Sequence, residues 1–567
     1  MSLRLESWYL PAASGPGSMR LRLVNAGPTT VEVGFELTFT TVVRLEPAAP
    51  AVLVRRTSGG HVVAPPNGVR LEPGATWEFI AACGHRPGHA NDGPESAYLR
   101  AADGSIRPVR TGATAVVRVA RAEAPTYRPV NATGAWTAVE YRDRRLHPHD
   151  SPVLSRTGEH PVSLDIDSAL GPDEHIVRSD GADLRVSAGS DTGLQRALTA
   201  LVSGARSGEL RRAGQHRPLH DWRGLHIDLA RQFFPAADVA WLIDIAGWYG
   251  LNRLHLHLTD DEGWRVPVDG YPALTDVGAR RGEGLPIPAV LGSGCEPYGG
   301  AYERGEIAAW VTAAGEAGVV IVPEIDVPGH CFAALSAYPE LADPDDASGA
   351  VSVQSFVDNV LNPGVPGTRP FVEAVFGSVA DLFPSPWLHI GGDEVPHGAW
   401  RGSPAARQYA AERGLASSGE IASTFVRDLI DLVVATTGRR VGAWQEAADS
   451  GALRPDDGYV VGWRSAPDCQ RLAAAGFHVV ASPAEVYYLD MAADSDWHTP
   501  GMSWAGHSSV TDIEAFDVTA GWSAAERGNV LGIQACAWTE HARDRPTLER
   551  LLFPRLTAIA ESAWHRI

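Results

Sequence analysis

Three patterns of hydrophobic and polar positions follow one another along the chain, and the first predicts a β-sandwich. In residues 1–121, short segments such as 19–24, 30–39 and 76–82 alternate between apolar and polar positions, and turns rich in Gly and Pro separate them. Alternation with a period of two is typical of strands that bury one face. Many short strands of this kind in series favour two packed sheets.

The second pattern covers residues 122–217. It begins with the Pro-containing segment 122–129 and continues with two strand-like segments, 162–166 and 184–187, ahead of a helical pattern over 191–203. Strands followed by a helix predict a small α+β domain.

The third pattern, in residues 218–567, alternates apolar segments of strand length with helical segments. The clearest helical segments are 236–249, 304–317 and 419–437. The strand-length segments are 225–229, 253–258, 319–323, 387–390, 440–444, 459–463, 477–482 and 530–538. Eight strands with helices between them predict a (β/α)₈ barrel, also called a TIM barrel. The predicted fold is therefore of the α/β class, with the barrel preceded by a small α+β domain and an N-terminal β-sandwich.

Net charge and the choice of basic residue exclude several kinds of protein. The chain has 48 basic and 68 acidic residues, and its formal net charge is −20. No lysine occurs in the sequence, which excludes mechanisms that need its amine, such as a Schiff base, a pyridoxal phosphate anchor or a P-loop. An acidic chain without a basic segment also argues against nucleic acid and against an anionic membrane as partners.

The cysteines and the amino terminus bear on where the protein works. The five cysteines lie far apart and none forms a C-x-x-C pair, so neither a disulfide framework nor a structural zinc site is predicted. The first residues lack an apolar segment of signal-peptide length. No segment approaches the roughly 18 apolar residues of a membrane span. We therefore expect a cytoplasmic protein.

Polar and aromatic residues follow the predicted barrel strands, where the loops of such a barrel build its active site. These residues are Arg231, Asp260, Asp261, Glu324, Asp326, His330, Asp393, Glu394, Trp444, Gln445, Glu446, Trp463, Tyr488, Asp490, Trp538 and Glu540. Carboxylates and Arg bind sugar hydroxyls, and an indole ring packs on the apolar face of a pyranose. The set favours a glycoside hydrolase.

The spacing of Asp393 and Glu394 narrows the mechanism. Adjacent residues have Cα atoms about 3.8 Å apart, so the two carboxylates are poorly placed for opposite faces of one sugar ring. The usual acid and nucleophile, with carboxyl groups about 5 to 5.5 Å apart, then lack a second member. A substrate that supplies its own nucleophile, a 2-acetamido group, removes this difficulty. The sequence permits that arrangement.

Three motifs in the barrel resemble one family. They are LHLHLTDDEGWR at 254–265, PEIDVPGH at 323–330 and HIGGDE at 389–394. Together they resemble the family 20 glycoside hydrolases, the β-N-acetylhexosaminidases. The similarity extends to the small α+β domain, which this family usually carries before its barrel. Residues 1–121 are similar to the carbohydrate-binding-like sandwich modules of some bacterial members.

The resemblance implies an exo-acting, retaining β-N-acetylhexosaminidase. Such an enzyme removes terminal β-linked N-acetylglucosamine, with N-acetylgalactosamine as a further candidate, by substrate-assisted catalysis through an oxazolinium intermediate. It needs no metal ion and no organic cofactor. Its partner is a glycan or oligosaccharide that ends in a β-N-acetylhexosamine.

Residue roles follow by matching positions to the family. Glu394 matches the general acid/base, and Asp393 matches the carboxylate that polarises the acetamido N–H. Tyr488 matches the hydroxyl that donates to the acetamido oxygen, and Asp260 and His330 match a pair that tunes Glu394. The residues matched to sugar binding are Arg231, Asp490 and Glu540 for hydroxyls, Trp444, Trp463 and Trp538 for the acetamido pocket, and Trp504 for the leaving group.

The adjacent carboxylates also predict how their protons are distributed. Like charges in a partly dry pocket raise the pKa of one carboxyl group, which we assign to Glu394, while hydrogen bonds keep Asp393 ionised. Two features depart from the family pattern and bear on leaving-group preference. Gln232 stands where a His is usual, and 283–304 is an irregular stretch.

Two other functions stay open. His255 and His257 lie on one face of a predicted strand, like the metal-binding pair of metal-dependent amidohydrolase barrels. That pair usually closes the first strand, however, and no carboxylated Lys is available here. The second alternative is a catalytically silent carbohydrate-binding barrel, against which the complete set of matched catalytic residues argues.

Overall fold

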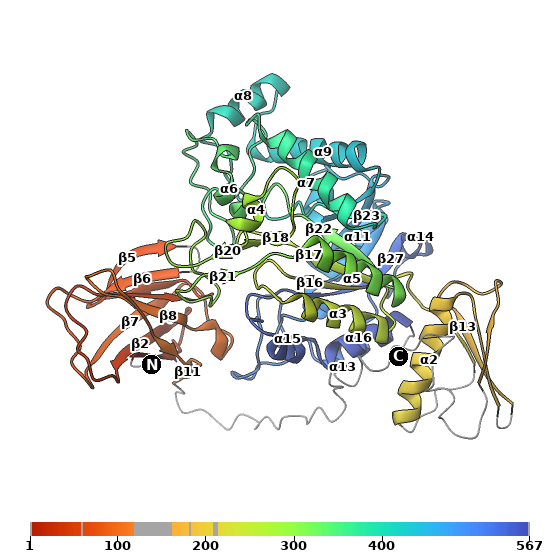
Figure 1. The fold of residues 1–567 in the computed structure, drawn as a ribbon, viewed down its shortest axis with the longest axis horizontal. Helices are drawn as coiled ribbons and strands as arrows, with labels where there is room; N and C mark the ends of the chain where they lie inside the picture. Colours follow the sequence, from red (N-terminus) through yellow and green to blue (C-terminus); the bar gives the residue numbers. More distant parts are fainter. Residues whose placement is uncertain (1–2, 58–59, 118–161, 181–182, 208–213, 565–567) are drawn as a thin grey trace.

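The structure is a computed structural model that describes residues 3–57, 60–117, 162–180, 183–207 and 214–564. It contains a pair of sheets, a small sheet with one helix, and a closed barrel (Figure 1). The segment 122–129 and the predicted boundary between residues 121 and 122 lie outside the described residues. The domain bounds given above remain predictions.

The first part of the chain is a β-sandwich, as predicted. One sheet has the strand order β10-β1-β2-β7-β4, with β11 beside β1, and the other has the order β5-β6-β3-β8-β9. Exposed and buried positions alternate strictly along β7 (Thr76–Cys83). Trp77 and Phe79 therefore point into a core that both sheets share.

The sandwich strands match the apolar alternation except at one place. The predicted strand over 30–39 is wrong in its first half, because only β3 (Glu36–Thr40) pairs as a strand, while Val31 makes an isolated bridge with Leu71. The other strands are β1 (Leu3–Leu10), β2 (Ser18–Asn25), β4 (Leu45–Pro47), β5 (Val52–Thr57), β6 (Gly60–Ala64), β8 (Glu95–Arg100), β9 (Ile106–Pro108), β10 (Arg110–Thr111) and β11 (Ala115–Val116).

The second part is a four-stranded sheet covered by one helix, which confirms the α+β prediction. The sheet has the order β12-β14-β13-β15, and helix α2 (Asp191–Ser207) packs Leu194 and Ala197 against Val177 and Val186. Its strands are β12 (Val162–Ile166), β13 (His175–Asp180), β14 (Asp183–Ala188) and β15 (Gly214–His216).

The third part is a closed parallel barrel of eight strands. Each strand overlaps its predicted segment, and the pairing of the last strand with the first closes the sheet. The strands are β16 (Trp222–Asp228), β17 (Arg253–His257), β22 (Val320–Glu324), β23 (Trp387–His389), β24 (Arg440–Trp444), β25 (Gly458–Gly462), β26 (Val479–Ala481) and β27 (Val530–Ala537). They are buried on both faces, which explains why they read as near-continuous apolar segments.

The helices around the barrel include the three predicted ones, α3 (Ala236–Trp248), α5 (Arg304–Glu316) and α9 (Ser418–Thr437). Ser417 begins α9 by accepting a hydrogen bond from the Glu420 N–H, and Gly438, with φ of 67°, ends it. The remaining helices are α4 (Ala273–Asp276), α6 (Phe332–Ala337), α7 (Thr368–Leu382), α8 (Pro404–Arg413), α10 (Gln445–Asp449), α11 (Ala466–Ala474), α12 (Ala484–Tyr487), α13 (Val510–Ala515), α14 (Ala524–Gly528), α15 (Arg545–Leu552) and α16 (Arg555–Trp564). Among the described residues, no helix has both the length and the apolar character that crossing a membrane requires.

The two smaller parts lie on opposite sides of the barrel (Figure 1). The α+β part covers the amino ends of the strands. There Arg196 of α2 donates to the Gly318 carbonyl, just before β22, and its Nε lies 2.7 Å from Asp173. The same Asp173 binds Arg223 of β16 at 2.6 Å. The sandwich instead contacts loops at the carboxyl ends, such as the one that contains Trp497.

We predict that Asp173→Asn destabilises the folded protein. The Arg196 and Arg223 side chains are 4% and 0% exposed, and they lower the pKa of Asp173 to about 2 although burial opposes its ionised form. Removing the shared anion leaves two buried cations without a counter-charge, a loss of about 3 to 5 kcal/mol. Urea unfolding at pH 7 measures it, with the exposed Asp165→Asn as the control.

The pH dependence gives a second measurement for the same pair of variants. A carboxyl group with a lowered pKa in the folded state stabilises the fold above its ordinary pKa of 3.8, and that stabilisation is lost as the pH falls toward 2. The difference between the parent protein and Asp173→Asn should therefore shrink on acidification. An unchanged urea midpoint for this variant at pH 7 would contradict the prediction.

Candidate active site

A cavity of about 750 Å³ opens at the carboxyl end of the barrel. Of the twelve residues predicted for the site, ten line it: Arg231, Asp393, Glu394, Trp444, Trp463, Tyr488, Asp490, Trp504, Trp538 and Glu540. The other two, Asp260 and His330, are buried behind its wall. The structure thus brings the predicted residues together, and their individual roles remain predictions.

The loop after β23 places the two adjacent carboxylates, and its glycines make this possible. Gly391 and Gly392 have φ of 68° and 89°, and Glu394 itself has φ of 44°. A Cβ on Gly391 would overlap the Asp326 side chain, so only glycine fits there. The Gly392 N–H donates to Asp326 Oδ1 at 3.1 Å. Asp326 therefore anchors the turn that presents Asp393 and Glu394 to the cavity.

The carboxyl groups of Asp393 and Glu394 differ in their surroundings. The Asp393 side chain is 11% exposed and that of Glu394 is 28% exposed. Burial, together with the charge of Asp326, raises the pKa of Asp393 well above its ordinary value. This is the reverse of the expectation that hydrogen bonds hold Asp393 ionised, because its Oδ1 has no hydrogen-bond partner among the described residues.

His330 connects the cavity to Asp260. Its Nδ1 lies 3.1 Å from Asp260 Oδ1, and its Nε2 lies 3.5 Å from Glu394 Oε2 and 3.8 Å from Asp393 Oδ2. Although burial favours the neutral ring, Asp260 raises the pKa of His330 well above its ordinary value. A cationic imidazole thus lies within reach of both adjacent carboxyl groups.

Arg231 lies among carboxylates at the other end of the same network. Its guanidinium is 2.8 Å from Asp260 Oδ2 and 3.4 Å from Glu262, and it stacks over the Trp538 ring. Burial raises the pKa of Glu540 to about 7, while Arg231 opposes this effect. Burial and Glu540 together raise the pKa of Asp490.

Among the residues that the structure describes, the oxygens Asp490 Oδ2 and Glu540 Oε2 have no hydrogen-bond partner. With Arg231 they offer both donors and acceptors to a ligand with several hydroxyl groups.

Aromatic rings form the remaining walls. The rings of Trp444 and Trp538 lie 5.7 Å apart, and Trp463 stacks on Tyr488 at 6.2 Å. Trp504 is 56% exposed and meets Trp463 edge to face. Burial raises the pKa of Tyr488, so its hydroxyl stays a neutral donor. Such walls suit the apolar faces of a sugar and its acetamido methyl group.

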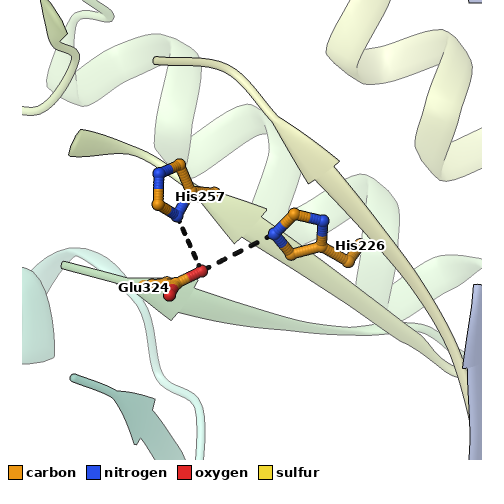
Figure 2. A group of neighbouring side chains, drawn as sticks. All are labelled: His226, His257 and Glu324. Carbon is orange, nitrogen blue, oxygen red and sulfur yellow. Dashed lines mark ion pairs between the residues drawn. The ribbon is translucent and has the colours of Figure 1, made fainter. Parts of the chain in front are cut away.

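His255 and His257, the pair that suggested a metal site, both lie against Glu324 in the barrel interior. Figure 2 shows His226 and His257 pointing toward Glu324 from neighbouring strands. His226, His257 and Glu324 have the donor atoms of a metal site, and so does the group of His255, Glu324 and His389.

Within these groups His257 pairs with Glu324 as an ion, whereas burial lowers the pKa of His226 and His255 to about 3 and about 4 and so favours their neutral rings. His255 and His257 lie 3.0 and 2.9 Å from one Glu324 oxygen, and Trp444 donates to the other at 2.6 Å. Burial disfavours the ionised form of Glu324, but His257, His389 and His255 lower the pKa of this carboxyl group. None of these histidines is among the residues that line the cavity. The metal ligands of the amidohydrolase hypothesis therefore lie behind the wall of the cavity and not inside it.

Gln232, noted in the sequence as a departure from the family pattern, donates to the carbonyls of Leu291 and Glu540 and so links two loops of the cavity. Other residues of the site were not indicated by the sequence. Residues of the sandwich line the cavity, as do Val353 to Phe356 after β22. These residues come from distant parts of the chain, and no local pattern could have revealed them.

Comparisons with known proteins agree on one family. The family described as "Glycosyl hydrolase family 20, catalytic domain" matches residues 220–567. A beta-hexosaminidase of Vibrio furnissii is 34% identical over 423 residues, which cover 73% of this chain and 68% of the relative. A beta-N-acetylhexosaminidase of Cellulomonas fimi is 34% identical over 413 residues, which cover 72% of each chain.

A solved structure is similar over the whole chain. It is the GH20 exo beta-N-acetylglucosaminidase of Vibrio harveyi in complex with N-acetylglucosamine. The two have a TM-score of 0.87 and 26% sequence identity, and the match covers 100% of this chain and 95% of that one. The likeness therefore includes the sandwich and the α+β part as well as the barrel.

We predict that the His330 ring stays protonated at pH values above its ordinary pKa of 6.5. Asp260 is the main group that raises this pKa, so Asp260→Asn should lower it. Titration of ¹⁵N-labelled histidine by NMR measures the pKa directly, and Asp276→Asn on the exposed end of α4 is the control. A His330 ring that titrates identically in the parent protein and in Asp260→Asn would rule out the proposed connection.

Proposed function

Because this chain belongs to glycosyl hydrolase family 20, we propose that its cavity binds the terminal β-linked N-acetylhexosamine of a glycan or oligosaccharide and hydrolyses the bond that attaches it. The enzyme is an exo-acting β-N-acetylhexosaminidase that retains the anomeric configuration. N-acetylglucosamine is the expected sugar, and N-acetylgalactosamine is a second candidate. The proposed reaction uses neither a metal ion nor an organic cofactor.

The observation that carries the proposal is the placement of two carboxyl groups at one edge of the cavity. Asp393 and Glu394 are consecutive, and both have an oxygen within 3.8 Å of His330 Nε2. A sugar in the cavity meets them on the same side, which suits a proton donor beside a group that holds the acetamido arm. It does not suit a nucleophile across the ring.

The first half of the reaction cleaves the glycosidic bond. The Glu394 carboxyl group gives its proton to the glycosidic oxygen as the bond from C1 to that oxygen breaks. The acetamido carbonyl oxygen of the substrate forms a bond to C1, which yields an oxazolinium ion and the free leaving alcohol. Asp393 accepts a hydrogen bond from the acetamido N–H, and the neutral Tyr488 hydroxyl donates to the acetamido oxygen.

The second half regenerates the enzyme. The Glu394 carboxylate takes a proton from water as the water oxygen forms a bond to C1. The bond from C1 to the acetamido oxygen breaks, and its electrons return to the acetamido group. Because C1 is attacked twice, from opposite faces, the sugar leaves with the configuration it had in the substrate.

Three charged residues define the non-reducing end of the site. Arg231 and Asp490 are nearly buried, and Glu540 lines the cavity beside them. We assign them to the O3, O4 and O6 hydroxyls. Their side chains close this end, so the polymer cannot continue past the bound sugar, and this supports exo-acting hydrolysis.

A small panel of substrates tests the proposal. We expect hydrolysis of 4-nitrophenyl N-acetyl-β-D-glucosaminide, weaker or equal hydrolysis of its galactosamine epimer, and none of the plain β-glucoside, which lacks the acetamido nucleophile. A thiazoline analogue of the intermediate should inhibit tightly. Equal turnover of the plain glucoside would require a protein nucleophile. Binding of N-acetylglucosamine without any turnover would favour the catalytically silent barrel.

Glu394→Gln tests the proton donor. A general acid contributes about 10²- to 10⁴-fold, so kcat/KM should fall by about that factor for a substrate with a sugar leaving group. The fall should be much smaller for 2,4-dinitrophenol as leaving group, because that alcohol departs without a proton. Glu373→Gln on the exposed face of α7 is the control. Near-native hydrolysis of a disaccharide by Glu394→Gln would refute the assignment.

A further inference from the structure

We propose that the N-terminal sandwich is part of the active site, where it forms the wall that binds the sugar unit on the leaving-group side of the scissile bond. This inference rests on the proposed function and names a further binding surface for it. Residues from three sandwich segments line the same cavity as Asp393 and Glu394. They are Thr40 to Val42, His85 and Arg86, and Asn91 to Gly93 with Glu95.

The sandwich is attached to the barrel by specific contacts with the loop after β26. The Ala90 N–H donates to the Trp497 carbonyl at 2.8 Å, and the Trp497 indole donates to the Thr114 carbonyl at 2.7 Å. The Trp497 ring also stacks on Tyr9, with centroids 5.7 Å apart. Nearby, His89 Nδ1 lies 2.9 Å from the Asp496 carbonyl. The wall is therefore held in a defined position.

Contacts with two other barrel loops fix the same face of the sandwich. Tyr98 and Arg100 bind the Glu283 carboxylate, which belongs to the irregular stretch seen in the sequence. Farther along that stretch, the Gly292 N–H donates to Thr40 at 3.2 Å. Glu95 pairs with Arg543 in the loop after β27. Three loops at the mouth of the cavity thus depend on the sandwich for their position.

Trp504 indicates which side of the cavity this wall faces. It lies in the loop that the sandwich holds, and Gly88 approaches the preceding residue, Ser503, so closely that a Cβ there would overlap it. The Trp504 ring meets Trp463 and Tyr488 edge to face. Since those two rings belong to the proposed acetamido pocket, Trp504 and the sandwich lie beyond the sugar that is cleaved off.

The chemistry of the wall favours a carbohydrate as its occupant. His85 and Arg86 are exposed, and Asn91 and Asp92 lie beside them. His541, in the loop after β27, faces Asp92 at 3.7 Å, and its side chain is 7% exposed. Neither ring nitrogen of His541 has a hydrogen-bond partner in the described part of the chain. This surface offers donors and acceptors for hydroxyl and acetamido groups, while the exposed Trp504 offers an apolar platform for a pyranose face.

The test compares two leaving groups on one bound sugar. The double variant with His85→Ala and Arg86→Ala should lower kcat/KM for chitobiose and chitotriose at least fivefold more than kcat/KM for 4-nitrophenyl N-acetyl-β-D-glucosaminide. Inhibition by the thiazoline, which has no leaving group, reports on the bound sugar alone. Arg70→Ala, on the sandwich but outside the cavity lining, is the matched control.

Each outcome of this test decides the proposal. Equal changes for all substrates, or no change for any, would overturn it. A larger effect on an alkyl glycoside than on chitobiose would overturn the assignment of a sugar as the occupant. If the unaltered protein failed to hydrolyse 4-nitrophenyl N-acetyl-β-D-glucosaminide, the proposed function would fail instead, so the two failures are distinguishable.

Discussion

A chain of contacts that begins with three buried, oppositely charged groups holds the site in place. It runs from Arg231 through Asp260 and His330 to Glu394, and its members follow the first four strands of the barrel. The charges of Arg231, Asp260 and His330 compensate one another at distances of 2.8 and 3.1 Å, and His330 Nε2 lies 3.5 Å from Glu394 Oε2. In a low-dielectric interior, removing one member leaves its neighbours uncompensated. One continuous network therefore sets the geometry of both the sugar-binding end, at Arg231, and the acid/base end, at Glu394.

Much of this architecture could be predicted from the sequence, for a physical reason. Barrel strands are buried on both faces and read as continuous apolar segments, and the residues that end them converge at one edge. That logic located Glu394, Tyr488 and three of the cavity tryptophans, Trp444, Trp463 and Trp538, whereas Trp504 came from the family resemblance. It did not give the ionisation of Asp393, because the burial and the nearby Asp326 charge that raise its pKa arise only in the folded chain. It placed His255 and His257 on one face of their strand, but it left open that this face turns toward Glu324 in the barrel interior.

The position of the sandwich was beyond sequence reasoning. Its contacts join Ala90 to Trp497 and Glu95 to Arg543, residues separated by most of the chain, and such pairs leave no periodic signal. The alternation along β7 describes which face is buried inside the sandwich. It contains no information about which outer loops meet the barrel. The sandwich, which the sequence pattern indicates as a separate unit, thus lies against the mouth of the cavity.

The order in which the chain is synthesised affects when each end of the barrel is covered. The sandwich emerges from the ribosome before the barrel, and domains tend to fold as they appear. Its partners on the barrel, Trp497 and Arg543, follow the seventh and the eighth barrel strand. The α+β part meets Leu251 and Gly318 much earlier. One end of the barrel can therefore be covered while its strands are still being added, whereas the mouth of the cavity is completed only after the eighth strand has been made.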